Sequence, residues 1–148
     1  MIQTKQAAVP NVYCLEEISE NCFKIIGIYP SQKAAARENS NWHQGTINKA
    51  IKGHIKGSGY YWVLEQDIQN DLKDWRPTRT KMRPTALLDD KGNIIEVHHN
   101  AREFEKINEY KQGVISASIC HGNKCFGKQY KYISEELYYE LMPITLVK

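Results

Sequence analysis

The chain has 148 residues, 41% of them hydrophobic and 25% charged, a composition that excludes a disordered or collagen-like protein. Its longest apolar runs, 60–64 and 144–147, are too short to span a bilayer, and the N-terminal sequence MIQTKQAAVP lacks the apolar core of a signal peptide. A cytoplasmic protein with no membrane partner is therefore expected. The formal charge of +3 is too small to indicate a nucleic-acid partner by itself.

Positive charge is concentrated in one part of the chain. Between residues 31 and 59 the basic residues outnumber the single acid, Glu38, whereas acidic clusters lie near both ends. Such a segment is a typical electrostatic footprint for a polyanionic partner. The basic residues in it are Lys33, Arg37, Lys49, Lys52 and Lys56.

The first elements along the chain are two predicted strands, 12–16 and 23–29, because β-branched and aromatic residues dominate both runs. Ser31 is then the expected N-cap of an alanine-rich helix that ends in polar turn formers. A second helix begins near Gln44 and buries Ile47 and Ile51, which lie one turn apart. Glycines end this helix before a short strand, 60–64.

The same order of elements recurs when the sequence is compared with itself at a shift of 68 residues. Positions that set packing and turns then coincide, whereas the polar positions between them differ. Two copies of one fold are therefore expected. The coinciding pairs include Ile26 with Ile94, Ala36 with Phe104, Ile47 with Ile115, Ile51 with Ile119, Gly59 with Gly127 and Trp62 with Tyr130.

The second copy follows the plan of the first. Its hairpin is predicted at 85–88 and 94–98, around a DDKGN turn. Asn100 is the expected cap of a helix that buries Phe104 and Ile107. A second helix with Ile115 and Ile119 on its buried side, a strand at 128–133 and a short helix at 134–142 complete the chain.

The predicted fold class is α+β, with two tandem units that each contain a β-hairpin, a helix-turn-helix and a short closing strand. The first unit is expected to span 1–66. The second is expected to span 83–148 and to include a C-terminal helical tail. Residues 67–82 are the expected connector, because Pro77 and Pro84 exclude a continuous helix there.

Two short helices joined by a tight turn, with an Ile-xxx-Ile buried stripe on the second, are typical of a helix-turn-helix. The segment SQKAAARENSNWHQGTINKAIKGHIKGSGYYWV resembles the modular DNA-binding repeat found beside HNH and GIY-YIG homing endonucleases. The second copy departs from that pattern, with Phe104 in place of an alanine and Tyr130 in place of the tryptophan. The resemblance implies binding of double-stranded DNA through the second helix, in a protein of phage or mobile-element origin. The residues that fit the pattern are Ser31, Ala34, Ala35, Ile47, Ala50, Ile51, Gly53, Gly59, Tyr60 and Trp62.

Helical periodicity, at about 100° per residue, predicts which side chains of the second helix face outward. In the first copy this arc holds Gly45, Thr46, Lys49 and Lys52, with Asn48 at its edge. Amides and hydroxyls can read base edges, and lysines contact phosphates. The corresponding arc of the second copy, Gly113, Val114, Ala117 and Cys120, is less polar and less suited to base readout. The predicted DNA-binding residues are Gln44, Thr46, Asn48, Lys49, Lys52, Lys56, Arg76, Arg79, Lys111, Gln112, Ser116, Lys124 and Lys128.

The basic segment RPTRTKMRP, which contains Arg76, Arg79, Lys81 and Arg83, has two interpretations of equal weight. It is either an arm that follows the DNA backbone or a charged linker without a partner. A structural or protein-interaction module, such as a phage virion or assembly component, is the alternative function. The weakly basic second unit and the acidic C-terminal segment would suit a protein partner.

The sequence predicts no catalytic residue, metal ligand or cofactor. The cysteines Cys14, Cys22, Cys120 and Cys125 form no CxxC pair, and Gly27-Ile28-Tyr29 lacks the second half of a GIY-YIG signature. A third hypothesis is a metal-dependent HNH-like nuclease built on His98 and His99. It would require an Asn and a further His on a returning hairpin and helix, and Asn108, His121 and Asn123 are poorly spaced for that role.

Overall fold

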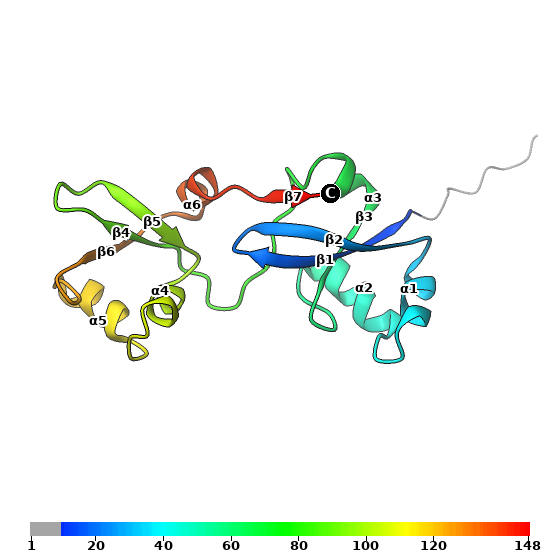
Figure 1. Ribbon diagram of the computed structural model, residues 1–148, viewed down its shortest axis with the longest axis horizontal. Helices are drawn as coiled ribbons and strands as arrows, with labels where there is room; N and C mark the ends of the chain where they lie inside the picture. Colours follow the sequence, from blue (N-terminus) through cyan, green and yellow to red (C-terminus); the bar gives the residue numbers. More distant parts are fainter. Residues whose placement is uncertain (1–9) are drawn as a thin grey trace, which may run out of the picture. The chain divides into compact units, whose positions relative to one another are not determined.

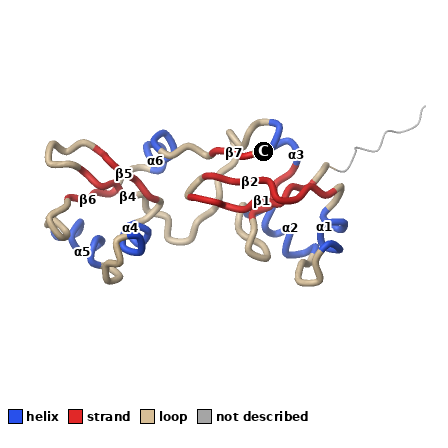
Figure 2. The backbone as a smooth tube through the Cα atoms, viewed as in Figure 1, coloured by secondary structure: helices blue, strands red, loops and turns tan. Residues whose placement is uncertain are grey.

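The computed structural model describes residues 10–148, which form six helices and two β-sheets and confirm the α+β fold class (Figures 1 and 2). The chain divides into two compact units. One comprises the residues up to Thr78 together with Ile144–Lys148, and the other comprises Arg79–Pro143. The predicted connector, 67–82, is therefore divided between the units, and residues 144–148 belong to the first unit rather than to a tail of the second.

A four-stranded sheet in the order β3-β1-β2-β7 forms the centre of the first unit. β1 (Val12–Ser19) and β2 (Cys22–Tyr29) make an antiparallel hairpin, and β3 (Tyr61–Leu64) pairs antiparallel with β1. β7 (Thr145–Val147), a strand that the sequence did not predict, pairs parallel with β2.

The hairpin of the first unit contains a β-bulge. Cys14 lies opposite Gly27, but the next residue, Leu15, lies opposite Ile25. Ile26 is therefore the extra residue on β2. A bulge bends and twists the strand that carries it.

Three helices accompany this sheet. α1 (Gln32–Glu38) begins at Ser31, whose Oγ accepts a hydrogen bond of 3.0 Å from the N–H of Ala34, as the sequence predicted. α2 (Gln44–Gly53) ends at His54, which adopts the left-handed conformation with φ 53°. α3 (Glu65–Gln69) follows β3 directly.

The alternation of side chains along the strands gives this sheet an apolar face on each side. α1 and α2 lie on one side of the sheet and α3 lies on the other (Figure 1). Ile68, Leu72 and Trp75, which the sequence placed in the connector, therefore contribute to a second core. The buried residues of the α1–α2 side are Val12, Cys14, Ala35, Ile47, Ala50 and Trp62. Those of the α3 side are Leu15, Phe23, Tyr61, Val63, Ile68, Leu72 and Trp75.

The second unit has a three-stranded sheet in the order β5-β4-β6. β4 (Thr85–Leu88) pairs antiparallel with both β5 (Ile94–His98) and β6 (Gln129–Tyr132). Its hairpin also contains a bulge. Leu87 lies opposite Glu96 and Leu88 lies opposite Ile94, which leaves Ile95 as the extra residue.

The helices of the second unit are α4 (Ala101–Ile107), α5 (Val114–His121) and α6 (Glu135–Leu141). The predicted cap Asn100 accepts a hydrogen bond of 3.0 Å from the N–H of Glu103. Phe104 is buried as predicted, but Ile107 is 59% exposed, so its assignment to the buried side of α4 was wrong. Ile107 is the last residue of the helix and lies beyond the turn that packs on the sheet.

This sheet, too, has a core on each face. Leu87, Phe104, Ile115 and Tyr130 belong to the core beneath α4 and α5. On the other face Ala86 and Val97 pack with Tyr138 of α6. None of the helices within residues 10–148 has the length and apolarity that crossing a membrane requires.

Candidate nucleic-acid interface

The outward side of α2 is the best-formed part of the predicted interface. Ile47 and Ala50 are buried against the sheet, and Lys49 and Lys52 are exposed on the opposite side of the helix. Gln44 is exposed in the first turn. The helix sequence, QGTINKAIKG, contains no acidic residue to offset these cations.

Thr46 and Asn48 are less accessible than the sequence predicted, since both side chains are half-buried. Thr46 lies beside the turn that follows α2. A Cβ placed on Gly57 would come within 3.2 Å of the Thr46 Cγ2 and 3.1 Å of its carbonyl oxygen. Helical periodicity predicts which side chains face away from the sheet. It carries no information on the turn after α2, which packs beside Thr46.

The turn after α2 is held by hydrogen bonds to the sheet. Gly57 forms an isolated β-bridge with Tyr60, and its carbonyl accepts a hydrogen bond of 2.9 Å from the Nε1–H of Trp62. Lys56, just before this turn, places its Nζ 5.7 Å from the centroid of the Tyr61 ring. Tyr61 packs in the core on the α3 side of the sheet, so the structure does not bring Lys56 together with Lys49 and Lys52.

Arg76 is folded back on its own segment. Its Nη1 donates to the carbonyls of Lys73 at 3.2 Å and Trp75 at 3.1 Å. The Arg76 carbonyl lies 2.8 Å from Nδ1 of His54, the residue that ends α2, and the His54 ring stacks on Trp75. Arg79 is half-buried and belongs to the second unit. The two arginines are therefore not part of one exposed arm.

The predicted residues of the second unit divide into two groups. Gln112 and Ser116 line a groove along α5, and Lys111 is exposed in the loop before that helix. Val114, expected to face outward, instead packs against the buried core of the unit. Cys120 is exposed on α5, where the first unit has Lys52 in α2.

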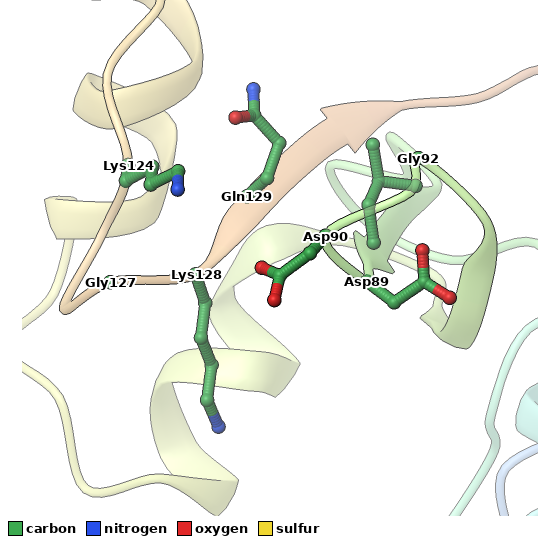
Figure 3. A pocket seen from close by; sticks show the side chains of 8 residues that line it. Asp89, Asp90, Gly92, Lys124, Gly127, Lys128 and Gln129 are labelled. Atoms are coloured by element: carbon green, nitrogen blue, oxygen red, sulfur yellow. The ribbon is translucent and has the colours of Figure 1, made fainter.

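Lys124 and Lys128 form the other group, in the turn between α5 and β6. With Gln129 they line a pocket of about 300 Å³ that also includes Asp89 and Asp90 of the β4–β5 turn. Figure 3 shows the Asp90 side chain extending toward the backbone at Lys128, whose own side chain extends away from the turn. The two acids offset the charge of the two lysines.

The β4–β5 turn is ordered by Asp89. Its Oδ1 accepts hydrogen bonds from the N–H of Asn93 at 2.8 Å and of Lys91 at 2.9 Å. These bonds, first of all those from Asn93, hold the pKa of the Asp89 carboxyl below its usual range. The turn-forming role that the sequence favours for this residue accounts for its geometry.

Glu105 is a residue whose role the sequence analysis missed. It is buried in α4, and its Oε2 accepts hydrogen bonds from the N–H groups of Gly113 at 3.1 Å and Ile115 at 3.0 Å. A carboxylate therefore occupies the N-terminus of α5, where an anion is favoured by the helix dipole. Two features of the sequence point to this role. A glutamate follows Phe104 on the buried side of a helix, and Gly113 has no side chain with which to cap the next helix.

The N-terminus of α2 differs from that of α5. Its N-cap, His43, makes no side-chain hydrogen bond to the helix, and the first turn contains no acidic residue. The start of α2 therefore lacks both a local side-chain cap and a local acid, whereas the start of α5 has the Glu105 carboxylate.

The chain matches no known protein family, no curated protein and no solved structure. Of the surfaces described above, the exposed side of α2 carries two lysines and no acid on its own helix.

The histidines and cysteines were also candidates for chemistry. His98 and His99 form two separate pairs, with Glu96 at 3.2 Å and with Glu103 at 3.8 Å. Among residues 10–148, no three His, Cys, Asp or Glu side chains are grouped so that they can hold a metal ion. The four cysteines are free thiols, and Cys14 and Cys125 are buried.

Proposed function

We propose that the protein binds double-stranded DNA, with α2 of the first unit as the reading helix. The observation that carries this proposal is the exposed side of α2, where Lys49 and Lys52 lie with no acid on the helix. A helix of this length is about 15 Å long, and the major groove, about 12 Å wide, admits an α-helix. Lysines would contact phosphates, while Gln44 and the edge residue Asn48 carry the amides that read bases.

The proposal includes two copies of one hairpin and helix-turn-helix unit. Several backbone features recur and support it. The extra residues of the two bulges, Ile26 and Ile95, are 69 residues apart, as are the N-caps Ser31 and Asn100. The recurrence therefore has a register of 69 up to the first helix, so Phe104 corresponds to the buried Ala35 and not to Ala36.

From the end of the second helix onward the register is 68. The isolated bridge Gly57–Tyr60 corresponds to Cys125–Lys128. The left-handed residues His54, Ser58 and Gly59 correspond to Gly122, Phe126 and Gly127. Bulges and positive-φ turns are determined by backbone geometry, so their recurrence does not depend on sequence identity.

The first unit is the proposed reader because the second lacks the same chemistry. Ala117 and Cys120 take the places of Lys49 and Lys52 at the 68-residue register. In addition, the Glu105 carboxylate already accepts from the N–H groups of Gly113 and Ile115, so these donors are not available to a phosphate.

The test is a salt titration of binding to random-sequence duplex DNA. Replacing Lys49→Ala and Lys52→Ala together should reduce the slope of log K against log salt by about 2, because two phosphate contacts are lost. The matched control is Lys24→Ala with Lys91→Ala, which removes two exposed charges, from β2 and from the β4–β5 turn. An unchanged slope in the α2 variant would reject this helix as the contact, and no binding even at low salt would reject the DNA function.

A protein-interaction module is the second candidate. The observation that favours it is the exposure of three isoleucines of the first hairpin, with Ile18 50%, Ile26 41% and Ile28 56% accessible. Adjoining exposed apolar residues mark surfaces that bind other proteins, and Ile26 and Ile28 lie two residues apart on β2. Replacing Ile26 and Ile28 by threonine should leave DNA binding unchanged, and it should abolish partner binding if this candidate is correct.

A further inference from the structure

A groove of about 650 Å³ runs beside α5 of the second unit. It is lined by the segment that enters the unit, by the first turn of α4 and by the exposed side of α5. We propose that this groove binds adjacent phosphate groups of the nucleic-acid backbone. The inference rests on the proposed DNA-binding function, and it gives the second unit its own contact with the DNA backbone. The residues that carry the argument are Lys81, Arg83, Arg102, Gln112, Ser116 and Tyr132.

Charge is the first reason. Three basic side chains, Lys81, Arg83 and Arg102, line the groove, and Glu105 is the one acid among its described lining residues. The Glu105 Oε2 is already occupied by two N–H groups of α5. The groove therefore keeps an excess of positive charge, whereas the pocket beside Lys124 and Lys128 contains two acids. An anionic ligand is favoured in the groove.

Arg83 is fixed in place before any ligand binds. Its guanidinium carbon lies 3.6 Å from the centroid of the Tyr132 ring. Its backbone N–H donates to the His99 carbonyl at 2.9 Å, and its own carbonyl accepts from Oγ1 of Thr85 at 2.9 Å. A guanidinium stacked on a ring keeps its N–H donors at the edge of the stack, where they suit a phosphate oxygen. Little side-chain entropy would be lost on binding.

Arg102 is oriented by an ion pair within α4. Its Nη1 is 3.6 Å from Oε1 of Glu105. This Nη1 is buried and has no hydrogen-bond partner among residues 10–148. The remaining N–H groups of this guanidinium, whose side chain is 39% exposed, can donate to a phosphate oxygen, as in other Arg–phosphate pairs. Gln112, just before α5, and Ser116, on α5, add neutral donors.

Cys120 provides a direct probe, because it lines the same groove and is exposed. Cys14 and Cys125 are buried, and Cys22→Ser removes the half-buried thiol. In that variant of the full chain, alkylation of Cys120 by N-ethylmaleimide is followed by mass spectrometry. A random-sequence duplex at ten times its Kd should slow the reaction by about tenfold through mass action. An equal concentration of inorganic phosphate should not.

Unchanged alkylation in the presence of bound duplex would overturn the groove as a contact. If inorganic phosphate protected Cys120 as well as the duplex does, the groove would be a site for free phosphate and not for the nucleic-acid backbone. Both outcomes leave the DNA proposal standing, since duplex binding is measured separately by the salt titration. Absence of duplex binding by the native chain would overturn both proposals.

Charge variants give a second, independent measurement. Lys81→Gln with Arg83→Gln should reduce the salt slope by about 2, and Lys91→Gln, outside the groove, should leave it unchanged. Because Arg83 packs on Tyr132, replacing it also removes a packing contact, so the single variant Lys81→Gln is measured as well. It removes one exposed charge and should reduce the slope by about 1. A slope equal to that of the native chain in both groove variants would overturn the proposal.

Discussion

The carboxylate of Glu105 on α4 accepts a hydrogen bond of 3.0 Å from the backbone N–H of Ile115 on α5. α5 begins at Gly113, which has φ 92° and no side chain with which to cap the helix. A residue of the preceding helix therefore performs the capping. The two helices are held together by this carboxylate as well as by their apolar contacts.

Replacing Glu105→Ala should reduce the free energy of unfolding by about 1–3 kcal/mol, because the N–H groups of Gly113 and Ile115 lose their acceptor. Urea denaturation followed by circular dichroism measures the change. Glu105→Gln keeps an acceptor oxygen and should cost less. Equal stability of the alanine variant and the native chain would contradict the capping role.

Replacement by alanine should have opposite effects on stability at two glycines of the first unit. Gly57→Ala should destabilise by about 1–3 kcal/mol through overpacking, because its Cβ would lie 2.9 Å from the Cβ of Ala50. Gly45 lies in α2 with open space around it, so Gly45→Ala should stabilise the fold, by up to about 1 kcal/mol. Thermal denaturation of both variants checks the signs. A stabilising Gly57→Ala would show that the turn after α2 is not closely packed.

Stability should decline at alkaline pH because of Cys14. Burial, with a smaller contribution from Glu16, raises the pKa of this thiol to about 12. The unfolded thiol ionises near pH 8.5, so the stabilisation is complete below that pH. It is lost as the pH rises toward the folded pKa, because only the unfolded state releases the proton. Urea midpoints measured from pH 7 to pH 10 should fall, and they should fall less steeply for Cys14→Ala. Parallel curves for the two chains would contradict this assignment.

Deleting residues 144–148 should destabilise the first unit by about 2–3 kcal/mol, because Ile144 and Leu146 pack against its core. The deletion also removes the hydrogen bond of 2.8 Å from the N–H of Thr145 to the Asn21 carbonyl. Tryptophan fluorescence follows this unit, since Trp42, Trp62 and Trp75 all belong to it. Deleting Lys148 alone removes an exposed ion pair with Asp71 and should cost less than about 1 kcal/mol. Equal midpoints for the two deletions would contradict a structural role for β7.

Local signals predicted the elements well. The hairpins, the caps Ser31 and Asn100, and the order hairpin, two helices and closing strand in each unit follow from propensity and periodicity over short windows. The exposure of Lys49 and Lys52 follows from the same periodicity. These features depend on neighbours in the sequence, which a single chain displays directly.

What the sequence did not predict depends on contacts between distant residues. β7 pairs with β2 across more than a hundred residues, and Leu72 and Trp75 form a core with Phe23. Nothing near these residues indicates their partners. Glu105 is a similar case, because the N–H groups that donate to its carboxylate lie at the start of another helix. The groove beside α5 required the fold to bring Arg83 and Arg102 to one place.

The route of the chain through the first sheet has a consequence for the order of folding. The chain leaves the first unit after Thr78 and returns to it at Ile144, so the second unit is an insertion. Adding β7 to the sheet closes a loop whose entropic cost increases with the length of flexible chain that it contains. A folded insertion removes most of that flexibility. Folding of the second unit should therefore precede the addition of β7 and accelerate it, which makes this strand the last to join the sheet and the first to leave it.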